Sequence, residues 1–307
     1  MHPRRALPLC VLLVAVLAGA LGSAQTLLPS SPQRRFGGSI SPVFEGWWDN
    51  PDGTHTFLLG YFSRNTEEEV DIPLGPNNRF EPGDADRGQP TYFMPGRHAG
   101  MFTVTVPKDW GKTQKLVWSL NSAGYATSVP MYMSPEYNVT PQQASEQGPN
   151  GKYNLPPVLR FEPAATAFTF PNASLATAAS TSTTVGASFP LDIHVEDDAQ
   201  YASGANTPML HLPPVVTLEV SKYRGAGTVT IASTQPAVTA IKGGKPLEPF
   251  AGTASTTVTF GSAGDYVLHV IANDYSGVSG GGAACCWTTA LMKVSVKGGR
   301  PTTTGGQ

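Results

Sequence analysis

Two adjacent cysteines, Cys285 and Cys286, are the residues of this chain best suited to redox or metal chemistry. A glycine-rich run, 280–282, precedes them and Trp287 follows. Adjacent Cα atoms are about 3.8 Å apart, whereas ordinary disulfides span roughly 4.4 to 6.8 Å, so a bond between the two closes a small strained ring. In an oxidising compartment two thiols tend to pair. The sequence therefore predicts a vicinal disulfide that shapes a loop; two free or metal-bound thiols, or a bond to another chain, are the alternatives.

A tryptophan pair, Trp47 and Trp48, is the second feature with binding chemistry. Successive residues of a strand point to opposite faces, so only one of the two can enter the same core. The other faces solvent, where with Trp110 or Tyr92 it could stack on a sugar ring or bind a partner protein. The alternative is a tryptophan that closes the open end of a sandwich.

No short motif identifies an enzyme class. The chain has no Gly-x-Ser-x-Gly elbow, His-Glu-x-x-His pair, phosphate-binding loop, dinucleotide fingerprint or haem-attachment motif. A Ser-His-Asp set assembled from distant residues stays open, because such sets are defined by geometry and not by spacing.

The N-terminus has the three parts of a secretory signal peptide. Arg4 and Arg5 come first, an uncharged apolar run follows over 6–21, and small residues precede a cut after Ala24. The apolar run is shorter than the ~20 residues that a membrane-spanning helix needs. We therefore expect export to the periplasm or the extracellular space, with no membrane span in the mature chain.

Charge argues against nucleic acid as a partner. The whole chain has 20 basic and 22 acidic residues, and the signal peptide removes two arginines and no acid, which leaves a net charge of −4. This charge is too small and too mixed to favour nucleic acid or an anionic membrane surface.

Alternating apolar residues predict strands along most of the chain. The clearest is 189–195, where Phe189, Leu191, Ile193 and Val195 form one face. A strand over 266–272 has Tyr266, Leu268, Val270 and Ala272 on its inward row, which leaves His269 on the outer face, covered or exposed. Many short strands with Gly- and Pro-rich turns predict an all-β protein of two tandem β-sandwich modules.

Composition sets the expected boundaries of these modules. Polar, Pro- and Gly-containing stretches indicate linkers and tails. The expected parts are a signal peptide (1–24), a flexible lead-in (25–39), a β-sandwich module of unknown family (40–139), a linker (140–157), a second sandwich (158–297) and a disordered tail (298–307).

The second module resembles bacterial immunoglobulin-like and PKD-like sandwich domains. The resemblance rests on Thr-Val-Thr-Phe-Gly-Ser-Ala-Gly-Asp-Tyr-Val-Leu over 257–268 and extends over 186–297. It implies that Tyr266 is the corner tyrosine that opens the penultimate strand. Leu268 stands where antibody domains have a cysteine, and the Trp-Asp-Phe-Gly-Asp-Gly signature of PKD repeats is missing. The resemblance therefore bears on the fold and says little about function.

The same resemblance implies that two loops meet at one end of the module. The loop after 189–195 begins with acids and carries Tyr201 and His211, and the loop after 266–272 carries Tyr275 and the cysteine pair. Oxygen-rich clusters bind Ca²⁺ and a Cys/His set binds softer metals, whereas plain turn-capping acids would face water. The candidate metal ligands are Asp197, Asp198 and Asp274, with Ca²⁺ as the ion. The candidate ligand-binding residues are Trp47, Trp48, Tyr201, Tyr275 and Trp287.

These features favour an exported, non-catalytic binding or structural protein of the periplasm or cell surface. Such a protein would present the loop ends of a sandwich to a ligand, a glycan or a protein. The alternatives are a metal-binding or redox protein that uses the cysteine pair, and a hydrolase whose site is assembled from distant residues. The sequence leaves the oligomeric state open.

Overall fold

The structure is a computed structural model that describes residues 33–139, 155–169, 174–199, 214–245, 248–274 and 286–298. Residues Arg34–Gln307 form one compact unit. The expected signal peptide, most of the 140–157 linker and nearly all of the C-terminal tail lie outside the described residues.

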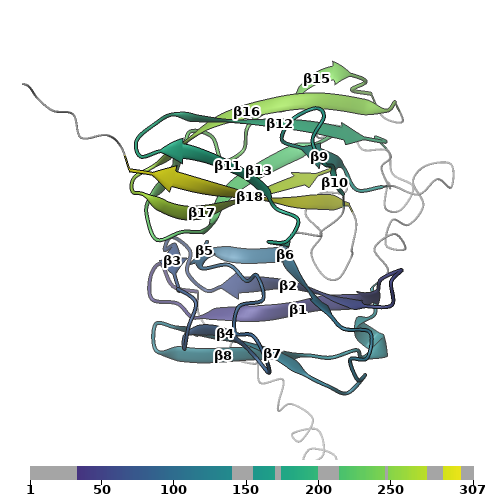
Figure 1. Cartoon of the computed structure of the whole chain (residues 1–307), viewed down its shortest axis with the longest axis vertical. Helices are drawn as coiled ribbons and strands as arrows, with labels where there is room; N and C mark the ends of the chain where they lie inside the picture. The colour runs from purple at the N-terminus through teal and green to yellow at the C-terminus, as the bar shows by residue number, and fades with distance from the viewer. Residues whose placement is uncertain are drawn as a thin grey trace, which may run out of the picture. The chain divides into compact units, whose positions relative to one another are not determined.

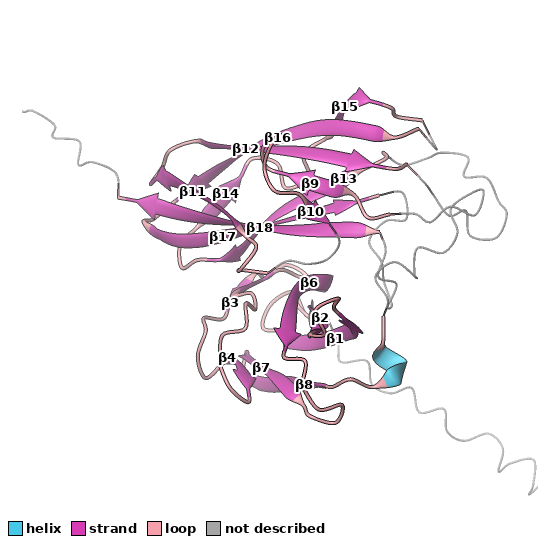
Figure 2. Ribbon diagram, turned by 45° about the vertical axis from the view of Figure 1, so that its right-hand side comes forward, coloured by secondary structure: helices cyan, strands magenta, loops and turns pink. Residues whose placement is uncertain are grey.

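The described residues are almost entirely strands and turns, as Figure 2 shows. Their one helical segment is a single 3₁₀ turn, η1 (Pro135–Tyr137), and none of their helices is long and apolar enough to cross a membrane. The all-β prediction is therefore confirmed. The strands of the N-terminal half are β1 (Ile40–Asp49), β2 (His55–Ser63), β3 (Val70–Asp71), β4 (Asn78–Glu81), β5 (Tyr92–Phe93), β6 (Gly96–Val106), β7 (Leu116–Ser122) and β8 (Tyr125–Met131).

The C-terminal half contains the strands that position the candidate site. They are β9 (Val158–Arg160), β10 (Phe168–Thr169), β11 (Ala179–Thr184), β12 (Phe189–Asp197), β13 (Thr217–Arg224), β14 (Val229–Ile231), β15 (Thr239–Lys242), β16 (Phe250–Phe260), β17 (Gly264–Asn273) and β18 (Trp287–Lys297).

The N-terminal strands form two three-stranded sheets and a short antiparallel pair. The strand orders are β1-β2-β6, β4-β7-β8 and β3-β5. Their apolar faces share one cluster of buried residues, called here the N-terminal core, in which Trp118 stacks on Phe80 at a centroid distance of 5.8 Å. The Trp118 indole N–H donates to Asn78 Oδ1 at 3.0 Å, so this buried ring also has its polar group satisfied.

The C-terminal strands form two larger sheets, which Figure 1 labels. One has the order β10-β9-β12-β16-β14, with β15 also paired to β16, and the other has the order β11-β18-β17-β13. Both sheets contribute side chains to a single buried cluster, called here the C-terminal core, which is consistent with a β-sandwich. The alternation predicted for β12 and β17 is confirmed by their inward residues, among them Ile193 and Val270, both 0% exposed.

One strand, β11, lies in an Ala/Ser/Thr-rich stretch that the apolar pattern does not mark. It pairs in parallel with β18, from Ala179 opposite Met292 to Thr184 opposite Lys297. Its burial alternates only between half-buried and exposed, because small polar side chains cover an edge of the sheet. Without an apolar row there is no periodic signal to read.

The outer face of β13, β17 and β18 is covered by residues of the N-terminal half. Tyr223, Val267 and Leu291 belong to the N-terminal core. The Tyr223 hydroxyl donates to Gly88 O at 2.5 Å, and Lys222 Nζ lies 3.0 Å from Asp71 Oδ1. The side chains on the face of this sheet opposite the C-terminal core are therefore buried against the N-terminal half.

Candidate functional site

Three strands of the C-terminal core, β12, β17 and β18, each have an inward-facing row of apolar side chains. At one end of the core each row continues into a residue with a polar side chain. In β12 the row Leu191, Ile193, Val195 continues to Asp197. In β17 the inward row of Leu268, Val270 and Ala272 continues to Asp274, and in β18 the row that contains Ala290 and Met292 reaches back to Cys286. Because side chains two apart share a face, the alternation that builds the core also aims these three polar residues at its end.

Hydrogen bonds and register show that these residues lie close together. Asn273 pairs with Trp287, and the next backbone N–H, that of Asp274, donates to Cys286 O at 3.2 Å. Asp197 is opposite Phe250 in the β12–β16 ladder. The carboxyl of Asp274 is near enough to raise the pKa of Asp197.

The Asp197 carboxyl is half satisfied. Oδ1 accepts a hydrogen bond from Ala199 N at 2.7 Å, which caps the turn in which Ala199 has a φ of 53°. Oδ2 is buried and has no hydrogen-bond partner in the described part of the chain, and the whole residue is only 7% exposed. An acid that capped a turn at the surface would have its second oxygen in water, whereas this oxygen is buried.

Burial shifts the protonation of this carboxyl. Desolvation, first, and the negative charges of Asp274 and Asp198 raise the pKa of Asp197 to about 8, against the smaller opposing effect of the Ala199 hydrogen bond. A carboxyl with this pKa is mostly protonated at neutral pH when nothing is bound beside it.

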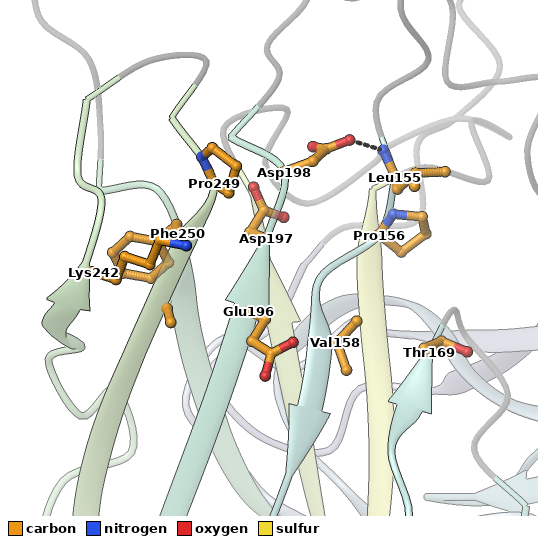
Figure 3. A pocket seen from close by; sticks show the side chains of 11 residues that line it. Leu155, Pro156, Val158, Thr169, Glu196, Asp197, Asp198, Lys242, Pro249 and Phe250 are labelled. Atoms are coloured by element: carbon orange, nitrogen blue, oxygen red, sulfur yellow. Dashed lines mark hydrogen bonds between the residues drawn. The ribbon is translucent and has the colours of Figure 1, made fainter. Parts of the chain in front are cut away.

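A pocket of about 680 Å³ opens at this end of the β9–β12–β16 sheet (Figure 3). Figure 3 shows Pro249 and Phe250 on one side of the end of β12, and Leu155 and Pro156 on the other. Most of the lining is apolar. The described residues that line it are Leu155, Pro156, Val158, Thr169, Glu196, Asp197, Asp198, Lys242, Pro249, Phe250 and Ala251.

The charged groups of the pocket are partly paired. Glu196 accepts from Arg160 Nη1 at 3.0 Å on the outer face of the sheet. Asp198 Oδ2 accepts from Leu155 N at 3.2 Å, the bond drawn as a dashed line in Figure 3. Lys242 is exposed and is the one lysine or arginine among the described lining residues.

The structure gives no support to a Ca²⁺ site at Asp197, Asp198 and Asp274. Over the described ranges, no group of three or more Asp, Glu, His or Cys residues is placed to hold a metal ion. Ca²⁺ takes about six to eight oxygen ligands, and the walls around Asp197 supply proline and phenylalanine carbons instead.

Cys286 is 1% exposed and takes part in a disulfide. The other two cysteines of the chain, Cys10 and Cys285, lie outside the described residues. The thiolate needed for metal binding or thiol chemistry is therefore not available at Cys286.

The three tryptophans predicted as binding residues are described by the structure, and none of them lines the pocket. Trp47 is 9% exposed and its indole N–H donates to Ser134 O at 2.7 Å, so it is the core-facing member of the tryptophan pair. Trp48 is half-buried and packs against a small cluster of Leu58, Ile271 and Trp287. Trp287 is 4% exposed, which leaves its ring no surface for a ligand. Tyr201, Tyr275 and His211 lie outside the described residues.

Among the described residues, one ion pair joins a histidine to a carboxylate, and it does not line the pocket. His55 Nδ1 lies 2.6 Å from Asp49 Oδ1, where β1 and β2 face each other, and the Asp49 side chain is 67% exposed. Neither residue lines the pocket described above, so the pair gives no particular support to a hydrolase.

Sequence reasoning singled out the acids of the pocket but none of its apolar walls. Phe250 could have been found, because it begins an alternating row, 250, 252, 254, 256, 258 and 260, that ends in Phe260. Leu155 and Pro156 fall within the stretch predicted as a linker, and nothing in their composition marks them as a binding wall.

Comparisons with known proteins add no identification. No protein-family model and no curated protein matches the sequence. A solved structure of a mutant of CfaE, the CFA/I adhesin of enterotoxigenic E. coli, aligns over 87% of this chain and 81% of its own, with 6% identity and a TM-score of 0.22. A TM-score this low carries no argument about fold or function.

Proposed function

We propose that this chain is an exported, non-catalytic binding protein of two tandem β-sandwiches that takes its ligand in the pocket beside Asp197. The observation that carries the proposal is the pocket itself: about 680 Å³ of space with mostly apolar walls. Pockets of roughly 300 to 1,000 Å³ with apolar walls and few polar groups are typical of small-molecule sites.

An immunoglobulin-like second sandwich is supported by strand order and by its tyrosine. In such a domain the strands corresponding to β12 and β16 lie in one sheet and those corresponding to β13, β17 and β18 lie in the other. The Tyr266 hydroxyl donates to Ser262 O at 2.9 Å, the backbone bond expected of a corner tyrosine. The strands that end at the pocket would then be followed by loops of one end of the sandwich.

Export rests on the N-terminal pattern of basic, apolar and small residues ending at Ala24. The partner proposed from sequence is a protein or glycan at the cell surface. The apolar walls favour an apolar molecule, or an apolar group of a partner protein, over a sugar, because sugar hydroxyls buried there would lose hydrogen bonds to water.

We also propose that Cys286 pairs with Cys285. The third cysteine, Cys10, is removed with the signal peptide in this account, so one thiol remains as a partner within the chain. Mass spectrometry of the unreduced exported protein should show the peptide with both cysteines two hydrogen masses below its reduced form. Two free thiols in that peptide would refute the pairing.

The binding proposal is tested with N-phenyl-1-naphthylamine, a neutral apolar dye that fluoresces when it leaves water. The mature protein should bind it saturably, and Val158→Trp should weaken binding at least about tenfold, because the larger ring occupies the pocket. Thr230→Trp adds the same ring at an exposed site on β14, outside the pocket lining, and should bind as the wild type does.

A second filling variant guards against misfolding of the first. Thr169 lines the pocket but is exposed, so Thr169→Trp fills space without disturbing a buried side chain. The proposal would be overturned if the wild type did not bind the dye saturably, or if Val158→Trp and Thr169→Trp both bound it as tightly as the wild type.

A further inference from the structure

The floor of the pocket is one row of side chains that crosses five strands. Each of β10, β9, β12, β16 and β15 contributes one lining residue, and each residue is the cross-strand neighbour of the next. In that order they are Thr169, Val158, Glu196, Ala251 and Lys242. Directly opposed residues of antiparallel strands have their side chains on the same face, so the whole row lies on the face away from the C-terminal core. Figure 3 shows the row from Lys242 through Glu196 to Thr169.

This row makes the pocket long in one direction and narrow in the other. Neighbouring strands lie about 4.8 Å apart, so the five strands span about 19 Å from Thr169 to Lys242. The next row on the same face is two residues along the strands, about 7 Å away. It contains Arg160, His194 and Thr253, and none of the three lines the pocket. The pocket therefore extends across the strands and not along them.

A wall on the other side of the row completes a channel. The segments before β9 and β16 and the one after β12 adjoin the same edge of the sheet, because these strands are antiparallel neighbours. They contribute Leu155, Pro156 and Pro249 to the lining. Leu155 is 50% exposed, so part of this wall is apolar surface that a ligand can cover.

We infer that this channel takes the unbranched aliphatic chain of a single-chain amphiphile, which lies across the strands with its polar head in water at one end. The inference rests on the binding proposed above and adds the chemical class of the ligand. Thr169 and Lys242, at the two ends of the row, are both exposed, so a head group at either end stays hydrated.

The middle of the channel suits methylene groups better than a polypeptide. Val158 and Ala251 stand on either side of Glu196, whose carboxylate accepts from Arg160 Nη1 at 3.0 Å and so has a charge partner outside the pocket lining. An extended polypeptide would bring backbone N–H and C=O groups against mostly apolar walls, where they would lose hydrogen bonds to water. An aliphatic chain has no such groups to satisfy.

The length of the row sets the length of the chain. A C–C bond of about 1.5 Å and a bond angle of about 111° give about 1.25 Å per methylene in an extended chain, so about 15 carbons span about 19 Å. Burial of each methylene is worth up to about fourfold in affinity. Affinity should therefore keep rising well beyond eight carbons, which cover only about 10 Å of the row.

The test uses alkyl maltosides, which share one neutral head group, each below its micelle concentration. Competition against N-phenyl-1-naphthylamine on the mature protein should show dodecyl maltoside at least about tenfold tighter than octyl maltoside. The isomer 6-cyclohexylhexyl maltoside also has twelve carbons, but its chain is shorter and ends in a wider ring. It should bind at least about fivefold more weakly than dodecyl maltoside, and maltose alone should not displace the dye.

Two variants shorten the channel from opposite ends. Val158→Trp and Ala251→Trp each place a ring one strand in from an end, which leaves about 10 Å of the row clear. By calorimetry, each should weaken dodecyl maltoside at least about tenfold and leave octyl maltoside within about threefold of wild type. Thr230→Trp, outside the lining, should leave both affinities unchanged.

The outcomes separate this inference from the binding proposal. If dodecyl maltoside and its ring isomer bind equally well, or if no maltoside displaces a dye that binds saturably, the chain inference is wrong and the apolar pocket stands. If the dye itself does not bind saturably, the binding proposal is wrong. Should both filling variants fail to fold, the comparison of the two isomers on the wild type still decides.

Discussion

Replacing Asp197 by asparagine should make the protein more resistant to unfolding at alkaline pH and change it little in acid. The folded carboxyl has a pKa of about 8 against an ordinary value of 3.8. Between those two values the folded state holds a proton that the unfolded chain has released. The wild type therefore loses stability as the pH rises from about 4 to about 8, and asparagine has no proton to lose.

The size of the effect follows from that difference. The two pKa values differ by about four, which corresponds to about 6 kcal/mol at about 1.4 kcal/mol per pKa unit. This is a ceiling, because water or a small cation that reaches the carboxylate would lower the cost of its charge. At acid pH the neutral carboxyl and the amide are similar in shape, and both accept from Ala199 N, so the two proteins should agree within about 1 kcal/mol.

Urea unfolding of both proteins at about pH 5, 7 and 9, followed by tryptophan fluorescence, measures the effect. Groups that titrate in both proteins cancel in the difference between them, and Asp192→Asn controls for the loss of one negative charge at an exposed position. The stability difference should grow steadily toward alkaline pH. Parallel pH profiles for the wild type and Asp197→Asn would show that Asp197 is not a buried carboxyl of raised pKa, and the reasoning would fail.

Three further substitutions test the framework around the site, each by urea unfolding. Gly100 has a φ of 58°, and an added Cβ would lie 2.5 Å from Trp287 Cζ2, so Gly100→Ala should cost about 1 to 3 kcal/mol; an unchanged midpoint would contradict this packing. Tyr266→Phe should cost about 1 kcal/mol by removing the hydroxyl bond to backbone, and no loss would argue against a corner tyrosine. Asp71→Asn should destabilise the protein more than Lys222→Met does. The first change leaves a 7% exposed lysine charge without its carboxylate partner, whereas the second leaves a half-exposed carboxylate that water can solvate. The reverse order of stability would refute this ion pair.

Much of the strand pattern could be predicted from sequence, because one face of each main strand packs in a core. Alternation in β12 and β17 reports directly which side chains are inward. The alternation gave no prediction at β11, because its small polar residues leave no period to detect. Short edge strands and stretches held by neighbours have little local signal.

The positions of the two carboxyls, Asp197 and Asp274, could be predicted from the sequence. Extending the inward rows of β12 and β17 by two residues leads to Asp197 and Asp274. Because side chains two apart share a face, the alternation that places the core residues also predicts the direction of these carboxyls. Alternation does not predict whether these carboxyls are buried, because the same residues in contact with water would be ordinary surface turn caps. The raised pKa of Asp197 depends on neighbours that are distant in sequence.

The contact between the two halves could not be predicted. His269 occupies the outer row of its strand, yet it is 1% exposed, stacks on Tyr223 at a centroid distance of 5.7 Å, and has its pKa lowered to about 3 by burial. Trp287 is buried for the same reason, beside Gly100 of β6. Which outer face is covered depends on how remote segments pack, and an alternating pattern contains no information about that.

The central claim is that an apolar ligand binds in the pocket lined by Leu155, Val158 and Pro249, and a crystal structure of the mature protein with N-phenyl-1-naphthylamine tests it most directly. We expect the aromatic rings of the dye within the pocket, against Val158 and Leu155. A dye molecule bound elsewhere on the protein, with the pocket empty, would contradict the claim.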